Sequence, residues 1–427
     1  MRNISRGSAL LLCFLLVCHH AGAYSLLTHE QLIDLTWQSS IAPLLRSRYP
    51  NITAEELERA RSYAYAGCVI QDIGYYPFGD PFFSDLTHYV RSGDFVVHLF
   101  QDAKDANQLA FAIGALSHYI GDNIGHSQAI NRAVPVEFPK LAAKYGPVVT
   151  FGEGQHPHIQ TEFAFDINEI AHRRLAPVHY LRHVGLNIPT EQLATAFYET
   201  YGLSQHFSKA RFQRVNVGGF RFAVRSFIPR IAYALTLLDR SRMPADSTSP
   251  DLQKLADEVA QVAADNNWDH YRKRAGIGTY SLAGFIYVLP KIGPLKLLAI
   301  KGPTDTTEEE YVRSVNQSTD ALSAALGRFG KPSPTLPNRD LDTGAPVQPG
   351  AYRLTDDTYA KLLDRLVADP RHTVPPGLKS DIVNYYADPK APIHTKKNPG
   401  KWARVQSELQ TLQTMPVSKQ PIATKTE

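Results

Sequence analysis

The 427-residue chain is poor in cysteine, with three in all. Cys13 and Cys18 lie within the first 23 residues, so Cys68 is the single cysteine of the remainder. A lone cysteine cannot form an intramolecular disulfide, and the chain has no CxxC pair to hold a metal or to exchange thiols. Beyond residue 23 the fold must therefore be stabilised by its apolar core, to which a bound metal would add.

The sequence also lacks a strong excess of charge. Its formal net charge is +4, and loss of Arg2 and Arg6 with the first 23 residues would lower this to +2, since that stretch contains no acidic residue. So small a surplus gives no strong nucleic-acid signal. We also find no internal repeat and no glycine-rich loop suited to phosphate.

Long apolar runs are missing as well. The run from Ala9 to Cys18 is about half of the ~20 residues that a membrane-spanning helix needs. It follows two arginines and precedes Ala21-Gly22-Ala23, which is the order of parts in a secretory signal peptide. We therefore expect residues 1–23 to be cleaved off after Ala23, and the protein to be secreted or periplasmic.

What the chain does contain is helical periodicity. No convincing series of alternating strands is present. Apolar residues recur at helical spacing, between loops rich in Pro, Gly and Tyr, over residues 28–48, 54–68, 103–133, 157–175, 191–206 and 217–239. These patterns predict an all-α domain over residues 24–240, with a long aromatic loop at 73–87 of the kind that often carries function.

The C-terminal half divides by composition. Residues 241–330 are expected to form a helical extension, 331–350 a Pro-rich linker, and 351–427 a small helical tail module. The apolar stretch 281–302 is interrupted by prolines and lysines, which argues against a spanning helix. We expect it to pack in the interior, with contact to a membrane surface as the alternative.

The stretch HYIGDNIGH places His118, Asp122 and His126 four residues apart, so they share one face of a helix. Gly114, Gly121 and Gly125 lie close to the same stripe, and each interior glycine costs roughly 1 kcal/mol, so three on one face suggest that something approaches closely there. Zinc prefers histidine and carboxylate ligands. Because the outer histidines are about 12 Å apart along the helix, Asp122 is best placed as a carboxylate shared by two metals, with His126 serving another.

Further ligands must come from other segments of the chain. His158 and Glu162, in HPHIQTEF, are again four residues apart. Asp72 and His88 stand at the two ends of the aromatic loop, and His29 lies near the expected mature N-terminus. A single His–Glu pair is weak evidence for a metal site, because the same spacing also occurs on solvent-exposed faces of helices. The whole set of histidines and carboxylates is harder to dismiss and predicts a zinc cluster.

These residues resemble the zinc-dependent phospholipase C family. Its all-helical trinuclear zinc architecture is shared with single-strand-specific nucleases and is similar to the N-terminal domain of glycosylphosphatidylinositol-specific phospholipase D. The resemblance covers roughly residues 24–235. It implies three Zn²⁺ ions: one held by Asp72, His88, His118 and Asp122; one by Asp122, His29 and the amino nitrogen and carbonyl oxygen of Tyr24; and one by His126, His158 and Glu162.

Two departures from the family pattern are visible. The mature chain begins with Tyr24 where tryptophan is common, which matters little if only backbone atoms ligate. The second helix histidine follows the bridging Asp122 by four residues, whereas secreted bacterial phospholipases and the nucleases have six. The shorter spacing resembles the glycosylphosphatidylinositol-specific branch, and it leaves the lipid head group open.

The resemblance implies an exported phosphodiesterase of the phospholipase C type, acting on phospholipid or another phosphodiester. Asp72 would ligate zinc and also take the proton of the attacking water. The aromatic side chains of the 73–87 loop either line an entrance for substrate or pack the loop onto the domain: Tyr75, Tyr76, Phe78, Phe82 and Phe83. A nuclease or nucleotide-type phosphoesterase, and a non-catalytic zinc-stabilised binding module, remain as alternatives because one scaffold hosts several functions.

Overall fold

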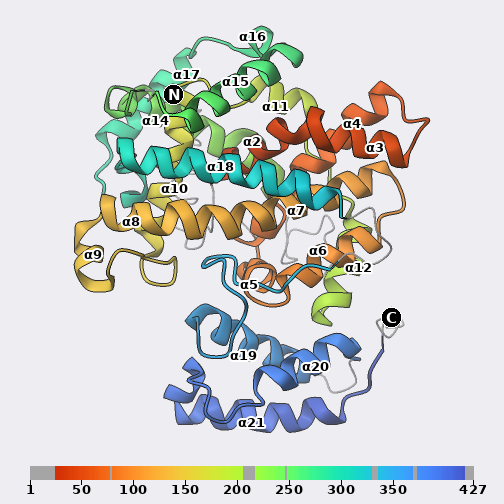
Figure 1. Cartoon of the computed structure of the whole chain (residues 1–427). Helices are drawn as coiled ribbons and strands as arrows, with labels where there is room; N and C mark the ends of the chain where they lie inside the picture. Colours follow the sequence, from red (N-terminus) through yellow and green to blue (C-terminus); the bar gives the residue numbers. More distant parts are fainter. Residues whose placement is uncertain are drawn as a thin grey trace, which may run out of the picture.

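We describe a computed structural model of the chain, over residues 25–76, 79–204, 217–245, 248–328, 335–368 and 373–418. The predicted signal peptide, Tyr24 and Phe78 lie outside the described residues. Within these ranges the protein is built of helices, and only two isolated bridges and no strand occur (Figure 1). The expected all-α fold is confirmed. None of the helices described is both long and apolar enough to cross a bilayer.

The first part of the chain folds much as its periodicity predicts. Three predicted helices are continuous but contain a wider π-helical turn, namely η1 (Trp37–Ile41), η3 (His126–Ile130) and η4 (Ala223–Phe227). The α-helices are α2 (Leu26–Thr36), α3 (Ala42–Arg48), α4 (Ala54–Gly67), α5 (Pro81–Tyr89), α6 (Ser92–Gln101), α7 (Ala106–Gly125), α8 (Asn131–Glu137), α9 (Pro139–Tyr145), α10 (Gln155–Ala171), α11 (Val178–Val184), α12 (Thr190–Tyr201), α13 (Val217–Phe222) and α14 (Ile228–Asp239).

The expectation of a long aromatic loop at 73–87 is wrong for much of its length. A 3-10 turn, η2 (Gln71–Gly74), is followed by α5, whose first residue is Pro81. The Asp80 carboxylate accepts a hydrogen bond from the Phe82 backbone N–H, which caps the helix. Phe82 and Phe83 are fully buried, so in this part of the segment packing accounts for the aromatic residues.

One glycine of the α7 stripe, Gly114, has a structural explanation. A Cβ added at Gly114 would lie 2.2 Å from the Ala64 carbonyl oxygen, and one added at Gly67 would lie 2.1 Å from the Phe111 carbonyl oxygen. The two glycines therefore allow α4 and α7 to pack backbone against backbone. The close approach that the sequence suggested at Gly114 is that of a neighbouring helix and not of a ligand.

Helix α2 is fixed at its N-terminus by a residue far away in sequence. The Asp166 carboxylate on α10 accepts hydrogen bonds from the backbone N–H groups of Leu27 and Thr28, at 3.1 Å each, and from the Thr28 hydroxyl at 2.8 Å. A carboxylate at a helix N-terminus also meets the positive end of the helix dipole. This contact sets the position of His29, the next residue along the helix.

The extension folds as α15 (Pro250–Asp265), α16 (Trp268–Tyr271), α17 (Ile277–Val288) and α18 (Asp305–Leu326), with the 3-10 turns η5 (Arg240–Arg242) and η6 (Gly293–Leu298). Helix α18 lies beside α7 and contacts α2 (Figure 1). It is tied to α10 because Glu308 accepts hydrogen bonds from Asn168 and Arg174, all three being buried. The Tyr311 hydroxyl also lies 2.8 Å from that of Thr28.

The expectation that residues 281–302 pack in the interior is only partly right. Ala283 and Ile286 of α17 are buried against α14. The other side of the segment is open to solvent, and Tyr287, Val288 and Ile292 are 75%, 72% and 67% exposed. Helix α17 ends at Val288, shortly before Pro290 and Lys291. The hydrophobicity of the segment did not by itself predict which face of this helix is buried.

The C-terminal module contains α19 (Arg353–Val367), α20 (Pro376–Tyr385), the 3-10 turn η7 (His394–Lys397) and α21 (Pro399–Thr414). Figure 1 shows it as a separate layer below α5, against which α19 packs. The segment before it, 335–352, lies on the main helical body. Leu341 and Asp342 are fully buried there, and the Leu341 N–H donates to the His88 carbonyl oxygen at 3.1 Å. This part of the Pro-rich stretch is packed chain and not a free linker.

Candidate metal centre

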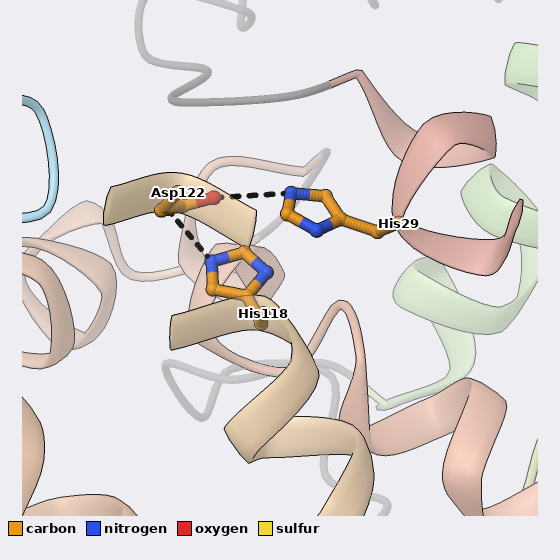
Figure 2. A group of neighbouring side chains, drawn as sticks. All are labelled: His29, His118 and Asp122. Atoms are coloured by element: carbon orange, nitrogen blue, oxygen red, sulfur yellow. Dashed lines mark ion pairs between the residues drawn. The ribbon is translucent and has the colours of Figure 1, made fainter. Parts of the chain in front are cut away.

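The centre is built around Asp122, one turn after His118 on α7. The two side chains meet as the four-residue spacing predicts, with Asp122 Oδ2 at 3.1 Å from His118 Nε2. The other carboxylate oxygen, Oδ1, lies 3.2 Å from Nε2 of His29, which arrives from α2 (Figure 2). All three side chains are fully buried.

A second set of side chains approaches Asp122 from the side of α5. His88 Nε2 lies 3.4 Å from Asp122 Oδ2 and 3.3 Å from Oδ1 of Asp72, which sits on η2. Within the described ranges, two groups of three donor atoms lie within 4.8 Å of one another: His29, His118 and Asp122, and Asp72, His88 and His118. The two groups share His118, and the Asp122 carboxylate faces both.

Two of the histidines are oriented by backbone carbonyl groups. His88 Nδ1 lies 2.7 Å from the Ser84 carbonyl oxygen, and His118 Nδ1 lies 3.0 Å from that of Cys68. A carbonyl oxygen only accepts hydrogen bonds, so each Nδ1 carries the hydrogen and each Nε2 is directed at the carboxylates. This is the arrangement by which proteins fix metal-binding imidazoles.

The electrostatics of the group follow from burial and from the opposed charges. Burial alone would raise the pKa of Asp122, but His118, His29 and His88 hold it well below its ordinary value. Burial likewise acts to lower the pKa of His88, yet the carboxylates of Asp122 and Asp72 raise it well above its ordinary value. The metal-free centre therefore favours a proton on the same nitrogen that a metal would occupy, so metal binding must release protons.

The third predicted ligand set is close together but less compact. His158 Nδ1 lies 2.7 Å from Glu162 Oε1, and the His126 and His158 rings stack with centroids 5.0 Å apart. His126, His158 and Glu162 do not form one of the two tight donor groups. Both ring nitrogens of His126 are buried without a hydrogen-bond partner. The π-helical turn η3 begins at His126, and such turns frequently occur at functional sites.

The His158–Glu162 pair is neutral without metal. Burial and the neighbouring His126 lower the pKa of His158 well below its usual value. Burial raises the pKa of Glu162, and the charges of Asp72, Asp122 and Asp342 raise it further. His158 Nε2 donates to the Asn131 side-chain oxygen at 2.8 Å, which leaves Nδ1 as the acceptor of the Glu162 proton. A cation between Nδ1 and Glu162 would replace that proton.

The donor set fits zinc. Nitrogen of histidine and oxygen of carboxylate are its usual ligands. Among the residues described, none of the buried carboxylates at the centre pairs with lysine or arginine, although an uncompensated buried charge is costly. At the centre, the buried carboxylate oxygens without a hydrogen-bond partner are Asp72 Oδ1, both oxygens of Asp122, and Asp342 Oδ1. Divalent cations would satisfy these oxygens in place of the protons on the histidines.

Sequence reasoning missed Asp342, which lies in the predicted linker. It is fully buried, and its Oδ2 accepts hydrogen bonds from the hydroxyl groups of Tyr89 and Tyr352, at 2.9 and 2.7 Å. The proline-rich composition of this stretch predicted a linker, and Asp342 is not part of any spacing typical of metal ligands. Of the other predicted residues, Tyr24 lies outside the described residues, and Tyr75 is buried with its ring 5.5 Å from that of His88.

Comparison with known protein families adds an independent line of support. The model of the family described as zinc dependent phospholipase C matches residues 28–208. The match supports the family that the ligand pattern indicated for this part of the chain. The matched residues include every predicted ligand except Tyr24. Comparison with curated proteins and with solved structures yields no match. The family supports a hydrolase, zinc as its metal and phospholipid as its substrate class.

Proposed function

We propose that this protein is an exported zinc-dependent phosphodiesterase of the phospholipase C type, which hydrolyses phospholipids at a centre of three zinc ions. The observation that carries the proposal is the Asp122 carboxylate, whose two oxygens face histidines from two different donor groups at 3.1 to 3.4 Å. A carboxylate shared in this way suits two neighbouring metal ions, which is the arrangement used to cleave phosphodiesters. Zinc bound there would supply Lewis-acid charge and lower the pKa of a coordinated water towards 7.

We assign the other roles in the reaction to side chains of the centre. His88 and His118, held by the Ser84 and Cys68 carbonyl groups, keep their Nε2 atoms in place. Asp72 is 5% exposed, whereas His88, His118 and Asp122 are fully buried, so it is the most accessible residue of this group. We assign it the proton of the attacking water. Burial of the histidines excludes bulk water from their side of the group.

We further propose that α17 and the chain after it contact the lipid surface. Among the exposed large apolar side chains of the described residues, the five most exposed all lie here: Ile277, Tyr280, Tyr287, Val288 and Ile292. Residues 272–302 contain no acidic residue and six basic ones: Arg272, Lys273, Arg274, Lys291, Lys296 and Lys301. An apolar face flanked by basic residues is the pattern of an interfacial helix on anionic lipid.

A substrate panel tests the reaction. The purified protein, processed to begin at Tyr24, is incubated with phosphatidylcholine, phosphatidylinositol lipids, single-stranded DNA and a generic phosphodiester, with and without chelator. We expect diacylglycerol release from lipid that chelator abolishes. Cleavage of DNA alone would move the assignment to the nuclease class, and zinc binding without any turnover would indicate a binding module.

Vesicle sedimentation tests the lipid contact. The double variant Tyr287→Ser/Val288→Ser should bind anionic vesicles at least about tenfold less well, because each removed side chain contributes roughly 1.5–3 kcal/mol when buried. The matched control Val136→Ser/Val148→Ser removes exposed apolar side chains elsewhere, 52% and 46% exposed, and should bind as the parent does. Equal binding by both variants would refute the contact.

A further inference from the structure

One carboxylate oxygen of Asp342 is buried without a hydrogen-bond partner, which is uncommon in a folded protein. Its side chain is fully buried, Oδ2 is held by Tyr89 and Tyr352, and Oδ1 has no hydrogen-bond partner. An unsatisfied buried polar group costs roughly 1–3 kcal/mol, and more when it is charged. In the third ligand set, both ring nitrogens of His126 are also buried without a hydrogen-bond partner. A cation bound by both residues would satisfy these atoms.

The backbone of Asp342 is linked to the third ligand set through Asn131. Asn131 donates from its side-chain nitrogen to the Asp342 carbonyl oxygen at 2.8 Å, while its side-chain oxygen accepts from His158 Nε2, also at 2.8 Å. Asn131, which is itself buried, thus joins the turn that carries Asp342 to the third ligand set in one hydrogen-bonded group.

The backbone around Asp342 is built to hold it there. The Leu341 N–H donates to the His88 carbonyl oxygen at 3.1 Å, and the Tyr119 hydroxyl donates to that of Pro337 at 2.6 Å. Gly344 has φ +69, and a Cβ added there would lie 2.5 Å from the Asn123 carbonyl oxygen on α7. Only glycine accommodates this turn without strain. The 335–352 segment is therefore seated on the helices that carry the centre.

We propose that Asp342 is a ligand of the third zinc ion, together with His126, His158 and Glu162. The inference rests on the metal centre of the proposed function, but it adds a residue from outside the region that the family model matches. These donors are spread more widely than the two tight groups, so their side chains must rotate inward as the ion binds. Four protein ligands are the number that a tetrahedral zinc site takes. This ion then fastens the 335–352 segment to the region that the family model matches.

Zinc binding by single variants of the full mature chain tests the assignment. Zinc per chain and its affinity are measured by competition with a chromophoric chelator. Asp342→Asn should lose one equivalent or weaken it about 10- to 100-fold, while the other ions stay bound. The matched control is Asp340→Asn: Asp340 is buried in the same turn, but its oxygens accept from Thr343 N–H and the Thr355 hydroxyl, at 3.2 and 2.6 Å. It should keep every equivalent.

Hydrogen exchange supplies a readout that does not depend on activity. Chelation should speed amide exchange over residues 338–347 in the parent, whereas Asp342→Asn should exchange fast there with or without zinc. Full zinc content and affinity in Asp342→Asn overturn the inference while the metal centre stands. A parent chain that binds no zinc overturns the proposed function as well.

Crystals of the zinc-loaded parent decide the question if Asp342→Asn does not fold. An anomalous peak at the zinc edge within about 2.2 Å of an Asp342 oxygen supports the inference. A peak on His158 and Glu162 that leaves Asp342 unligated overturns it.

Discussion

Replacement of Asp122 by asparagine perturbs the centre at the residue that both donor groups share. The change keeps the shape of the side chain but removes its charge. It also replaces one carboxylate oxygen by an amide nitrogen, which cannot bind zinc. Asp122 is fully buried and lies 3.1 to 3.4 Å from three histidines. Removal of one partner from a buried charge pair costs roughly 3–5 kcal/mol. Since about 1.4 kcal/mol is tenfold, zinc affinity should fall between about 100-fold and several thousand-fold.

The assay combines zinc per chain with initial rates of diacylglycerol release from phosphatidylcholine. Asp122→Asn should lose zinc from both donor groups and reduce the rate more than His158→Ala, because His158 contacts only the third set. Asp356→Asn is the matched control. Asp356 is a buried carboxylate of the C-terminal module whose oxygens accept from the Tyr385 hydroxyl and the His394 and Gly350 N–H groups. It should change stability but not zinc content.

Two outcomes would refute this reasoning. If Asp122→Asn kept the full zinc content and rate, the carboxylate would not bridge two ions. If Asp122→Asn and His158→Ala lost equal activity with equal loss of zinc, the division into a shared and a peripheral ligand would be wrong.

The remaining predictions concern stability, processing and pH. Chelation should lower the melting temperature by several degrees, since zinc at about 1,000 times its Kd stabilises by ~4 kcal/mol; an unchanged melting curve would deny the metal any structural role. A tag fused before Tyr24 should remove about one zinc and most activity, and proteolytic exposure of Tyr24 should restore both; full zinc in the extended chain would contradict the role of the N-terminal amine. Burial and Arg91 lower the pKa of His98 to about 4, so the stability it contributes is present above pH 6.5 and is lost as pH falls towards 4, by at most about 3 kcal/mol. Urea melts of His98→Gln at pH 7 and pH 4.5 should show a smaller loss than the parent, and an identical loss would refute the assignment.

The local parts of the fold were predictable from the sequence. His118 and Asp122 meet because a four-residue spacing on one helix fixes their relation without any knowledge of the rest. The capping box at Thr53 and Glu56 marks the start of α4 for the same reason. In contrast, α5 was missed because its aromatic residues and Pro81 resemble a loop, although Asp80 and Pro81 are a helix start.

The parts that depend on long-range packing could not be predicted. Nothing near Asp166 shows that it caps α2, 138 residues away. Gly114 indicated a close approach, but its partner, the backbone of α4, is visible only in the fold. Asp342 carries no spacing signal, and its role depends on the turn at Gly344 that seats it among Tyr89, Tyr352 and Asn131. The sequence of a segment shows which reactive side chains it contains. Long-range packing determines which of these side chains meet in the folded protein.

The most direct test of the central claim is zinc per chain measured alongside phospholipid hydrolysis in one titration. The protein beginning at Tyr24 is stripped with chelator, zinc is added back stepwise, and bound metal and diacylglycerol release are measured at each step. We predict no activity in the stripped protein and recovery that is complete only when both ions at Asp122 are bound. Full hydrolysis by a chain that holds less than one zinc would contradict this prediction.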